Sequence, residues 1–334
     1  MMKFETTEQN PLHQQLSKLD YLHIDEIAVE GFLCDEDYEL LTKMSGENGS
    51  LKTIDLYEVN ATECCCEYAT GTYEQTGIAI EDFAFVDSIK LERIILPKLL
   101  EAIGSNSFSG CVNLKEIDLP DSLQSIGSYA FQICPKLGEV YINKDVKLGY
   151  ICDYSFAGSA SSFKCDLNQW PLNEKGGKVF EIEEERFSHD GVLFCYSELE
   201  KYPSNHERSV YNVPSGISGI SNGAFGVCGN LKKIVFPESC EIFTSGAIFD
   251  CQKLETLVFK SHKIDGVKCF HWDDFISNVI ANCPKLQDIY LYAEDPSKIS
   301  FCVFEDLCLS DIVLHVPRFC ADKYRQREEE FIYS

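Results

Sequence analysis

The 334-residue sequence predicts a repeat solenoid, mainly of β-structure, whose successive coils stack and pair short strands in parallel. Two observations predict this fold. Apolar residues recur every 23 positions along much of the chain, and each repeat carries a short stretch of the pattern L-x-x-I-x-L in which the last apolar positions alternate. One such strand cannot bury its apolar side by itself, so neighbouring repeats must share a core.

The repeat is clearest between residues 99 and 142. Shifted by 23 positions, the matched pairs are Ile103 and Ile126, Gly104 and Gly127, Phe108 and Phe131, Cys111 and Cys134, Leu114 and Leu137, and Ile117 and Val140. A period of about 20–29 residues with recurring leucine and isoleucine is typical of leucine-rich repeats, so we expect a curved, right-handed coil with a parallel β-sheet. The phenylalanines and cysteines should fill the wall opposite the strands, and the glycines should occupy a bend that a Cβ would hinder.

The pattern extends in both directions from this stretch. Upstream, Ile80, Phe85 and Ile94 occupy the matching positions, and downstream the series resumes at Ala224 and recurs at Ala247. The last repeat begins 32 positions after the one before it, which predicts an inserted loop. Residues 143–167 form a degenerate repeat, because Phe156 lies 25 rather than 23 positions after Phe131.

The chain divides into five parts. They are an N-terminal cap (1–60), a first repeat block (61–167), a β-hairpin insertion (168–208), a second repeat block (209–316) and a C-terminal helical cap (317–334). In the first cap, apolar residues between positions 22 and 29 predict a strand, and residues 31–46 predict a helix with Asp35 as its N-cap. Alternating residues from about Val192 to Tyr202 predict the hairpin, and a last helix is expected from about Ala321.

The charge and the hydropathy of the chain exclude some classes of partner. Acidic residues outnumber basic ones by 54 to 29, for a net charge of −25, which argues against nucleic acid and against charge-driven binding to an anionic membrane. No apolar stretch is long enough for a membrane-spanning helix, so no membrane insertion is expected. The start MMKFETTEQNPLHQQ has no apolar signal-peptide core and reads as cytoplasmic. We expect a monomer.

The 17 cysteines are mostly interpreted as structural. Five occupy the same repeat position: Cys111, Cys134, Cys228, Cys251 and Cys283. Their apolar neighbours predict small buried thiols, with disulfides or a metal site as the alternative. Residues Cys64–Cys66 are interpreted as part of a loop, since adjacent cysteines do not easily form one tetrahedral site. An odd number of cysteines leaves at least one unpaired.

No catalytic motif is present in the sequence. There is no G-x-S-x-G, P-loop, G-x-G-x-x-G, H-E-x-x-H or C-x-x-C pattern, and neither a cofactor nor a catalytic residue is predicted. The alternative is a hydrolase or metal-dependent enzyme with its site in the insertions, near His189 and Asp190 or between His271 and Asp274. The latter segment is interpreted as a solvated loop with Trp272 and Phe275 packed inward.

The outward positions of the repeat strands give a candidate binding surface. They lie between the last two core positions of each strand: Ile95, Asp118, Tyr141, Val235, Val258 and Tyr290. Stacking would align them as a stripe on the concave sheet face, less polar than a solvated sheet requires. Two alternatives stay open. Strand propensity alone selects valine, isoleucine and tyrosine, or the hairpin of the same chain covers the stripe.

The repeat I-G-S-x-x-F-x-x-C-x-x-L-x-x-I/V-x-L/I resembles the BspA-type (Treponema-type) leucine-rich repeat over roughly residues 50–325. The hairpin segment DGVLFCY and the ending HVPRFCADKY also resemble that family. The resemblance implies a bacterial binding scaffold without catalytic residues, often at the cell surface or secreted and implicated in adhesion. We therefore expect a non-enzymatic protein that binds a protein or glycan partner.

Overall fold

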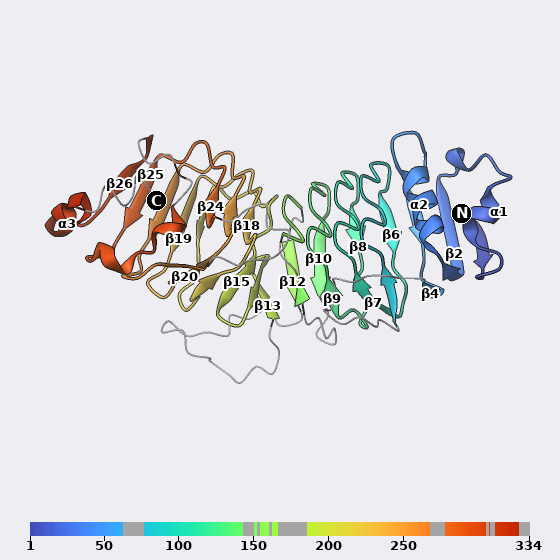
Figure 1. Ribbon diagram of the computed structural model, residues 1–334, viewed down its shortest axis with the longest axis horizontal. Coiled ribbons are helices and arrows are strands. Elements are labelled where there is room, and N and C mark those ends of the chain that lie inside the picture. Colours follow the sequence, from blue (N-terminus) through green and yellow to red (C-terminus); the bar gives the residue numbers. More distant parts are fainter. Residues whose placement is uncertain are drawn as a thin grey trace. The chain divides into compact units, whose positions relative to one another are not determined.

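The computed structural model of the chain describes residues 1–62, 77–142, 150–151, 154–159, 162–165, 186–267, 278–304, 307 and 311–326. The chain forms two compact units, residues 1–166 and residues 167–334. In each unit short strands follow one another along the chain and pair with their counterparts in the next coil (Figure 1). The predicted fold, a mainly β repeat solenoid with parallel sheets, is confirmed.

The first unit opens with a small cap of strands and helices. Its elements are β1 (Met2–Thr6), α1 (Leu12–Leu16), the 3₁₀ helix η1 (Tyr21–His23), β2 (Glu26–Leu33), α2 (Asp35–Ser45), β3 (Thr53–Asp55) and β4 (Val59–Thr62). The predicted helix is α2, but its N-cap is Cys34 rather than Asp35. The reason is Asp37, whose carboxylate accepts a hydrogen bond from the Cys34 backbone N–H at 3.3 Å and so places the helix start one residue earlier. Tyr38 of α2 packs edge-on against Phe85 and seals this end of the core.

Parallel ladders hold the remaining coils of the first unit together. The strands are β5 (Ile78–Ile80), β6 (Arg93–Ile95), β7 (Leu100–Ile103), β8 (Glu116–Ile117), β9 (Ser125–Ile126), β10 (Glu139–Ile142), β11 (Tyr150–Ile151) and β12 (Ser162–Cys165). One sheet has the order β1-β2-β3-β6-β8 with β4 also paired to β2, a second has the order β11-β9-β7-β5, and β10 pairs with β12. Ile54, Ile94 and Ile117 lie side by side in this register. The step from Ile94 to Ile117 reproduces the 23-residue sequence period, whereas Ile54 lies 40 positions before Ile94.

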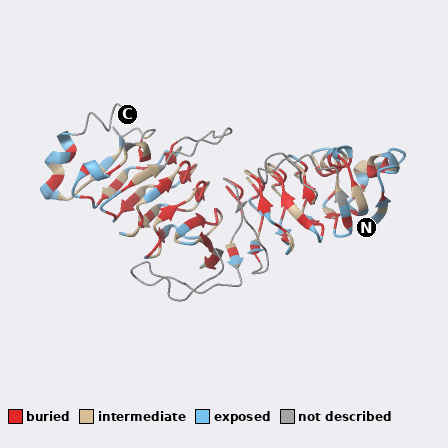
Figure 2. Cartoon of the chain, turned by 60° about the horizontal axis from the view of Figure 1, so that its bottom comes forward, coloured by how far each residue is buried: buried red, intermediate tan, exposed pale blue. Residues whose placement is uncertain are grey.

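A column of phenylalanine rings fills the wall opposite the first sheet. Phe85, Phe108, Phe131 and Phe156 are all buried and stack at centroid separations of 5.3, 5.1 and 5.0 Å. Phe156 keeps its place in the column, so the two extra residues of the degenerate repeat do not shift the core. Figure 2 shows buried residues lining the inside of the coils.

A Cβ would be hindered at the repeat glycines, as predicted, but the cause is the preceding coil and not a tight bend. A Cβ on Gly104 would lie 2.6 Å from the backbone nitrogen of Asp82, and one on Gly127 would lie 2.5 Å from that of Ser105. The glycines are needed because the preceding coil passes so close, and not because of a left-handed backbone conformation.

The second unit repeats this architecture after an antiparallel hairpin. Its strands are β13 (Arg186–His189), β14 (Val192–Cys195), β15 (Glu198–Lys201), β16 (Val210–Asn212), β17 (Gly219–Ile220), β18 (Phe225–Gly226), β19 (Lys233–Phe236), β20 (Ile242–Thr244), β21 (Ile248–Phe249), β22 (Thr256–Phe259), β23 (Asp265–Val267), β24 (Ile280–Ala281), β25 (Asp288–Leu291) and β26 (Val313–His315). The helical segments are the 3₁₀ helices η2 (Pro296–Lys298), η3 (Phe301–Val303) and η5 (Arg318–Cys320), and the α-helix α3 (Ala321–Gln326). The predicted hairpin, β14 with β15, and the helix start at Ala321 are both confirmed.

Three sheets enclose the core of the second unit. Their orders are β16-β19-β22-β25-β26, β13-β14-β15-β17-β20-β23 and β18-β21-β24. The hairpin belongs to the second of these sheets, where β15 pairs in parallel with β17. The hairpin therefore extends one wall of the solenoid instead of lying across the sheet β16-β19-β22-β25-β26.

The five repeat-position cysteines are buried, as the sequence predicted. The thiols of Cys111, Cys134 and Cys251 each donate a hydrogen bond, at 3.2 Å, to a phenylalanine carbonyl of the preceding coil. Burial raises the pKa of Cys111 to about 12 and that of Cys134 well above its ordinary value. These cysteines are therefore packing groups that also tie one coil to the next. Cys64–Cys66 lie outside the described residues.

Candidate binding surface

The first sheet of the second unit presents two aligned rows of side chains on its outer face. Strand register places Asn212, Val235, Val258, Tyr290 and His315 next to one another, and we call this set the central row. The register also aligns Val210, Lys233, Thr256, Asp288 and Val313, which we call the flanking row. Alternation along each strand points both rows away from the core.

The central row combines aliphatic side chains with a fixed aromatic pair. Val235 is half-buried and Val258 is only 7% exposed between its neighbours. The rings of Tyr290 and His315 stack with centroids 4.0 Å apart and planes 4° from parallel. His315 Nε2 also lies 2.7 Å from the Asp288 carboxylate, so the imidazole is held from two sides.

The side chains at one end of the central row are held in a fixed arrangement. The ladder fixes the backbone of the row, and the ring stack together with the Asp288 hydrogen bond fixes the side chains at its β25–β26 end. A partner would not have to order these groups, so less of the interaction free energy is lost on binding.

The outer face of the first unit has a different chemistry. Asp118 is exposed and Ile95 is half-buried, and the flanking residues Arg93 and Glu116 form an ion pair at 3.9 Å. Tyr141 is 41% exposed, and the Lys164 amine lies 5.9 Å from the centre of its ring. Charged groups therefore accompany the outward positions of this unit.

The structure thus divides the six predicted stripe residues into three sets. Val235, Val258 and Tyr290 form one continuous row in the second unit. Ile95 lies on β6 and Asp118 follows directly after β8, its neighbour in the sheet, while Tyr141 lies on β10, whose ladder partner is β12. Sequence reasoning missed Asn212 and His315, the two ends of the central row. The 23-residue offset from Val235 and the alternation within β26 would have identified them.

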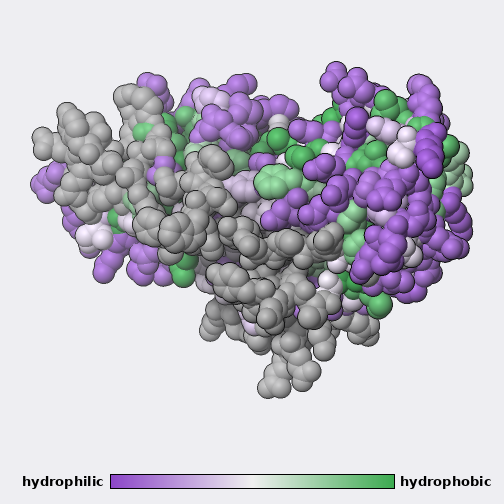
Figure 3. All heavy atoms as spheres, turned by 45° about the vertical axis from the view of Figure 1, so that its right-hand side comes forward, coloured by the Kyte–Doolittle hydropathy of each residue, from purple (hydrophilic) through white to green (hydrophobic). Residues whose placement is uncertain are grey.

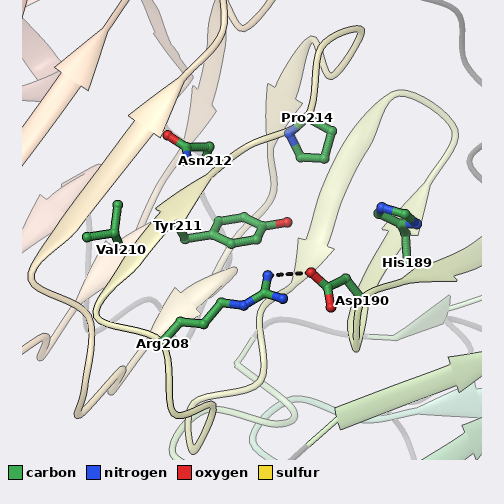
Figure 4. Close-up of a pocket in the computed structure, with 7 residues that line it drawn as sticks. All are labelled: His189, Asp190, Arg208, Val210, Tyr211, Asn212 and Pro214. Atoms are coloured by element: carbon green, nitrogen blue, oxygen red, sulfur yellow. Dashed lines mark ion pairs between the residues drawn. The ribbon is translucent and has the colours of Figure 1, made fainter.

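A pocket of about 290 Å³ adjoins the row at β16. It is lined by His189, Asp190, Arg208, Val210, Tyr211, Asn212 and Pro214. Figure 4 shows His189 and Asp190, beside the β13–β14 turn, facing Arg208 and the first strand of the sheet. The side chains of Arg208 and Asp190 form an ion pair across this space. The pocket shares Val210 and Asn212 with the two rows, so it continues the same surface.

The electrostatics of this pocket centre on the pair of Arg208 and Asp190. The pKa of Arg208 is raised, first by its hydrogen bond to Asp190. Burial raises the pKa of the Tyr211 hydroxyl, so this phenol stays protonated at neutral pH. The lining residues contain no serine, cysteine or lysine that could act as a nucleophile. The other predicted enzymatic segment, His271 to Asp274, lies outside the described residues.

Hydrophilic side chains cover much of the described part of the face drawn in Figure 3. Figure 3, which turns the N-terminal end of the chain forward, shows hydrophobic residues scattered among hydrophilic ones. No helix of the described residues is long and apolar enough to span a membrane.

The repeats and their register define a class of protein, the leucine-rich-repeat scaffolds. The model of the BspA type leucine rich repeat region matches the chain in six copies over residues 60–187 and 204–317. The chain belongs to this BspA-type leucine-rich-repeat family.

Solved structures with this fold come from several bacteria. A leucine rich cell surface protein of Faecalibacterium prausnitzii is 17% identical, with 96% of this chain and 85% of that chain covered and a TM-score of 0.50. The pneumococcal vaccine antigen PcpA is 16% identical, with 97% and 80% covered and a TM-score of 0.48. No curated protein matches the chain.

Proposed function

We propose that the chain is a non-enzymatic binding protein whose second unit contacts a protein partner through the central row. The observation that carries this proposal is the row itself. Five strands align two valines and a stacked tyrosine–histidine pair on an outer face, with Val210 and Val313 of the flanking row 46% and 57% exposed. Aromatic anchors within an apolar, preordered patch are the usual core of a protein–protein interface.

Strand propensity does not account for this row. Propensity acts equally on both units, because their outer faces are built from the same repeat. At equivalent positions the first unit carries Asp55, Asp118 and Lys164. The fold therefore tolerates charge at these positions, and the low charge of the central row calls for a reason other than strand formation.

Cover by the chain's own hairpin does not explain the row either. Strands β14 and β15 pair within the sheet that continues to β17, on a different wall of the second unit. The partner is then expected to be another molecule. The cell-surface name of the Faecalibacterium structure makes secreted and surface proteins the first candidates to screen, and adhesion the first biological role to test.

Site-directed photo-crosslinking tests the proposal. A photoreactive amino acid replaces Val313 in the flanking row, and in a matched bait it replaces Tyr196, which is 53% exposed on the β14–β15 turn. Each bait is exposed to secreted and surface proteins. The row bait is expected to crosslink a discrete protein that the turn bait does not.

Two tyrosine variants then quantify the contact with the protein so captured. Tyr290→Ala is expected to weaken its binding at least tenfold, as for an aromatic anchor, while Tyr196→Ala leaves it unchanged. Both variants should keep the far-ultraviolet circular dichroism of the wild type. Equal binding by Tyr290→Ala and the wild type would overturn the row as the contact surface. Binding to a glycan array without any protein crosslink would replace the protein partner by a carbohydrate.

A further inference from the structure

A cluster of metal-ligating side chains lies in the N-terminal cap, away from the sheet faces. His13 comes from α1. Cys34 is the residue before α2, and Glu36 lies in the first turn of that helix. One potential ligand atom from each of the three lies within 4.8 Å of the other two. The three residues are separated by at most 23 positions in sequence but belong to different elements, so the fold has brought them together.

The geometry points to a site for a zinc-type divalent transition metal ion, and we propose that His13, Cys34 and Glu36 are its ligands. The Cys34 sulfur and His13 Nδ1 are 3.7 Å apart. Tetrahedral zinc with bonds of about 2.3 Å to sulfur and about 2.05 Å to nitrogen places these two ligand atoms about 3.6 Å apart. A donor set of imidazole, thiolate and carboxylate selects zinc over magnesium or calcium, which prefer oxygen ligands alone.

A buried carboxylate holds the cluster in place. Asp37 is fully buried and accepts a hydrogen bond from the His13 backbone N–H at 2.7 Å and one from the Cys34 N–H at 3.3 Å. Its Oδ1 also lies 2.9 Å from His13 Nδ1. The two backbone bonds fix both ligand-bearing residues whether or not a metal is bound.

The cluster is also open on one side. Cys34 is 5% exposed, whereas the His13 side chain is 32% exposed and Glu36 is exposed to solvent. A metal ion can therefore enter past Glu36, and a water molecule can complete a four-coordinate site. Binding needs the thiolate and an imidazole without a proton on Nδ1. The Cys34 proton therefore passes to solvent, and the metal ion replaces the proton between His13 Nδ1 and Asp37, so that the imidazole proton resides on Nε2.

Such a metal ion would clamp α1 to the start of α2. These two helices, with β1 and β2, close the first end of the solenoid. A ligand that binds only the folded cap stabilises it in proportion to the logarithm of its free concentration over Kd. The site is independent of the proposed binding row, which lies in the other unit.

Cobalt substitution tests the site on the full-length, chelator-treated and reduced protein. Co²⁺ bound to a thiolate gives a charge-transfer band in the near ultraviolet, and tetrahedral Co²⁺ absorbs strongly in the visible. We expect one equivalent of Co²⁺ to produce both bands and Zn²⁺ to abolish them. The protein has 17 cysteines, so the variants and not the wild type alone decide the assignment.

Two ligand variants are matched by two controls. Cys34→Ser should remove the charge-transfer band, while Cys302→Ser, at a half-buried thiol elsewhere, should keep it. Glu36→Gln should weaken Zn²⁺ at least tenfold, while Glu39→Gln, at an exposed carboxylate on the same helix, should not. Glu36 is exposed, so this variant folds, and its unfolding midpoint should no longer rise with added Zn²⁺. An unchanged cobalt spectrum in Cys34→Ser, or no cobalt binding by the wild type, would refute the site.

Discussion

Replacing Phe131 by alanine tests whether the phenylalanine column holds the first unit together. Phe131 is fully buried, with Phe108 stacked on one side at 5.1 Å and Phe156 on the other at 5.0 Å. Truncating a buried phenylalanine costs about 3–5 kcal/mol, the range being set by how far the surroundings collapse into the cavity. Each lost contact between rings adds about 0.5–1.5 kcal/mol to the cost expected from the loss of buried apolar area.

The upper part of that range is expected for Phe131→Ala. Backbone hydrogen bonds from Phe108 to Ala130 and from Phe131 to Ser155, both 2.7 Å long, fix the spacing of the coils. The neighbouring rings therefore cannot close the gap, and we expect a loss of about 4–5 kcal/mol. The free energy of unfolding of a typical domain is about 5–15 kcal/mol in total, so the variant should be close to unfolded at 37 °C.

Urea unfolding followed by far-ultraviolet circular dichroism measures this loss. Phe83→Ala is the matched control, since Phe83 is in the same unit but 57% exposed, and it should change stability by less than about 0.5 kcal/mol. A loss below 1 kcal/mol for Phe131→Ala, or equal losses for the two variants, would show that the column does not carry the stability assigned to it.

Three further predictions concern the coils. Gly127→Ala should destabilise the fold because its Cβ meets backbone 2.5 Å away, whereas Gly229→Ala, with no atom within 4 Å, should be neutral or slightly stabilising in the same urea assay. Ile133→Gly should raise the free energy of unfolding by up to ~1 kcal/mol, because Ile133 is half exposed at φ +55° and Gly110 already occupies the equivalent position of the preceding coil. The thiol contribution to stability should be constant below pH 8 and fall above pH 9, since the unfolded chain ionises thiols that the fold keeps protonated, with the pKa of Cys111 at about 12. Each such thiol should cost about 1–2 kcal/mol by pH 10, and Cys111→Ala should show a shallower decline in a pH series of urea titrations.

The core of the solenoid could be predicted because its positions repeat in identical surroundings. A buried residue such as Phe108 meets the residue 23 positions later in the next coil, so one sequence offset gives both the pairing and the register. The same logic fails where the backbone is unusual. Tyr129 and Ile133 adopt left-handed conformations that sequence preferences assign to glycine or asparagine. Hydrogen bonds to the next coil, such as the one from Ile133 N–H to Ala157, override that preference.

The candidate surface could be predicted only in part. Alternation placed Tyr141 and Tyr290 outward, but it could not distinguish a tyrosine covered by a lysine amine from one stacked on a histidine. His315 is joined to Tyr290 by a 25-residue step, which includes 3₁₀ helices and departs from the period. Sequence reasoning named His189 and Asp190 but could not place Arg208 opposite them, since no repeat relates these two segments.

Inside and outside positions of the same strand therefore carry different kinds of information. Ile289 is fully buried, and its replacement would reduce stability whatever the partner is, whereas the next residue, Tyr290, is only half-buried and touches its row neighbours. Because a solenoid is stabilised by contacts between adjacent coils, its outward residues are free to vary from coil to coil. We therefore expect Tyr290, at an outward position of the central row, to report on partner binding, and it can be altered without dismantling the core.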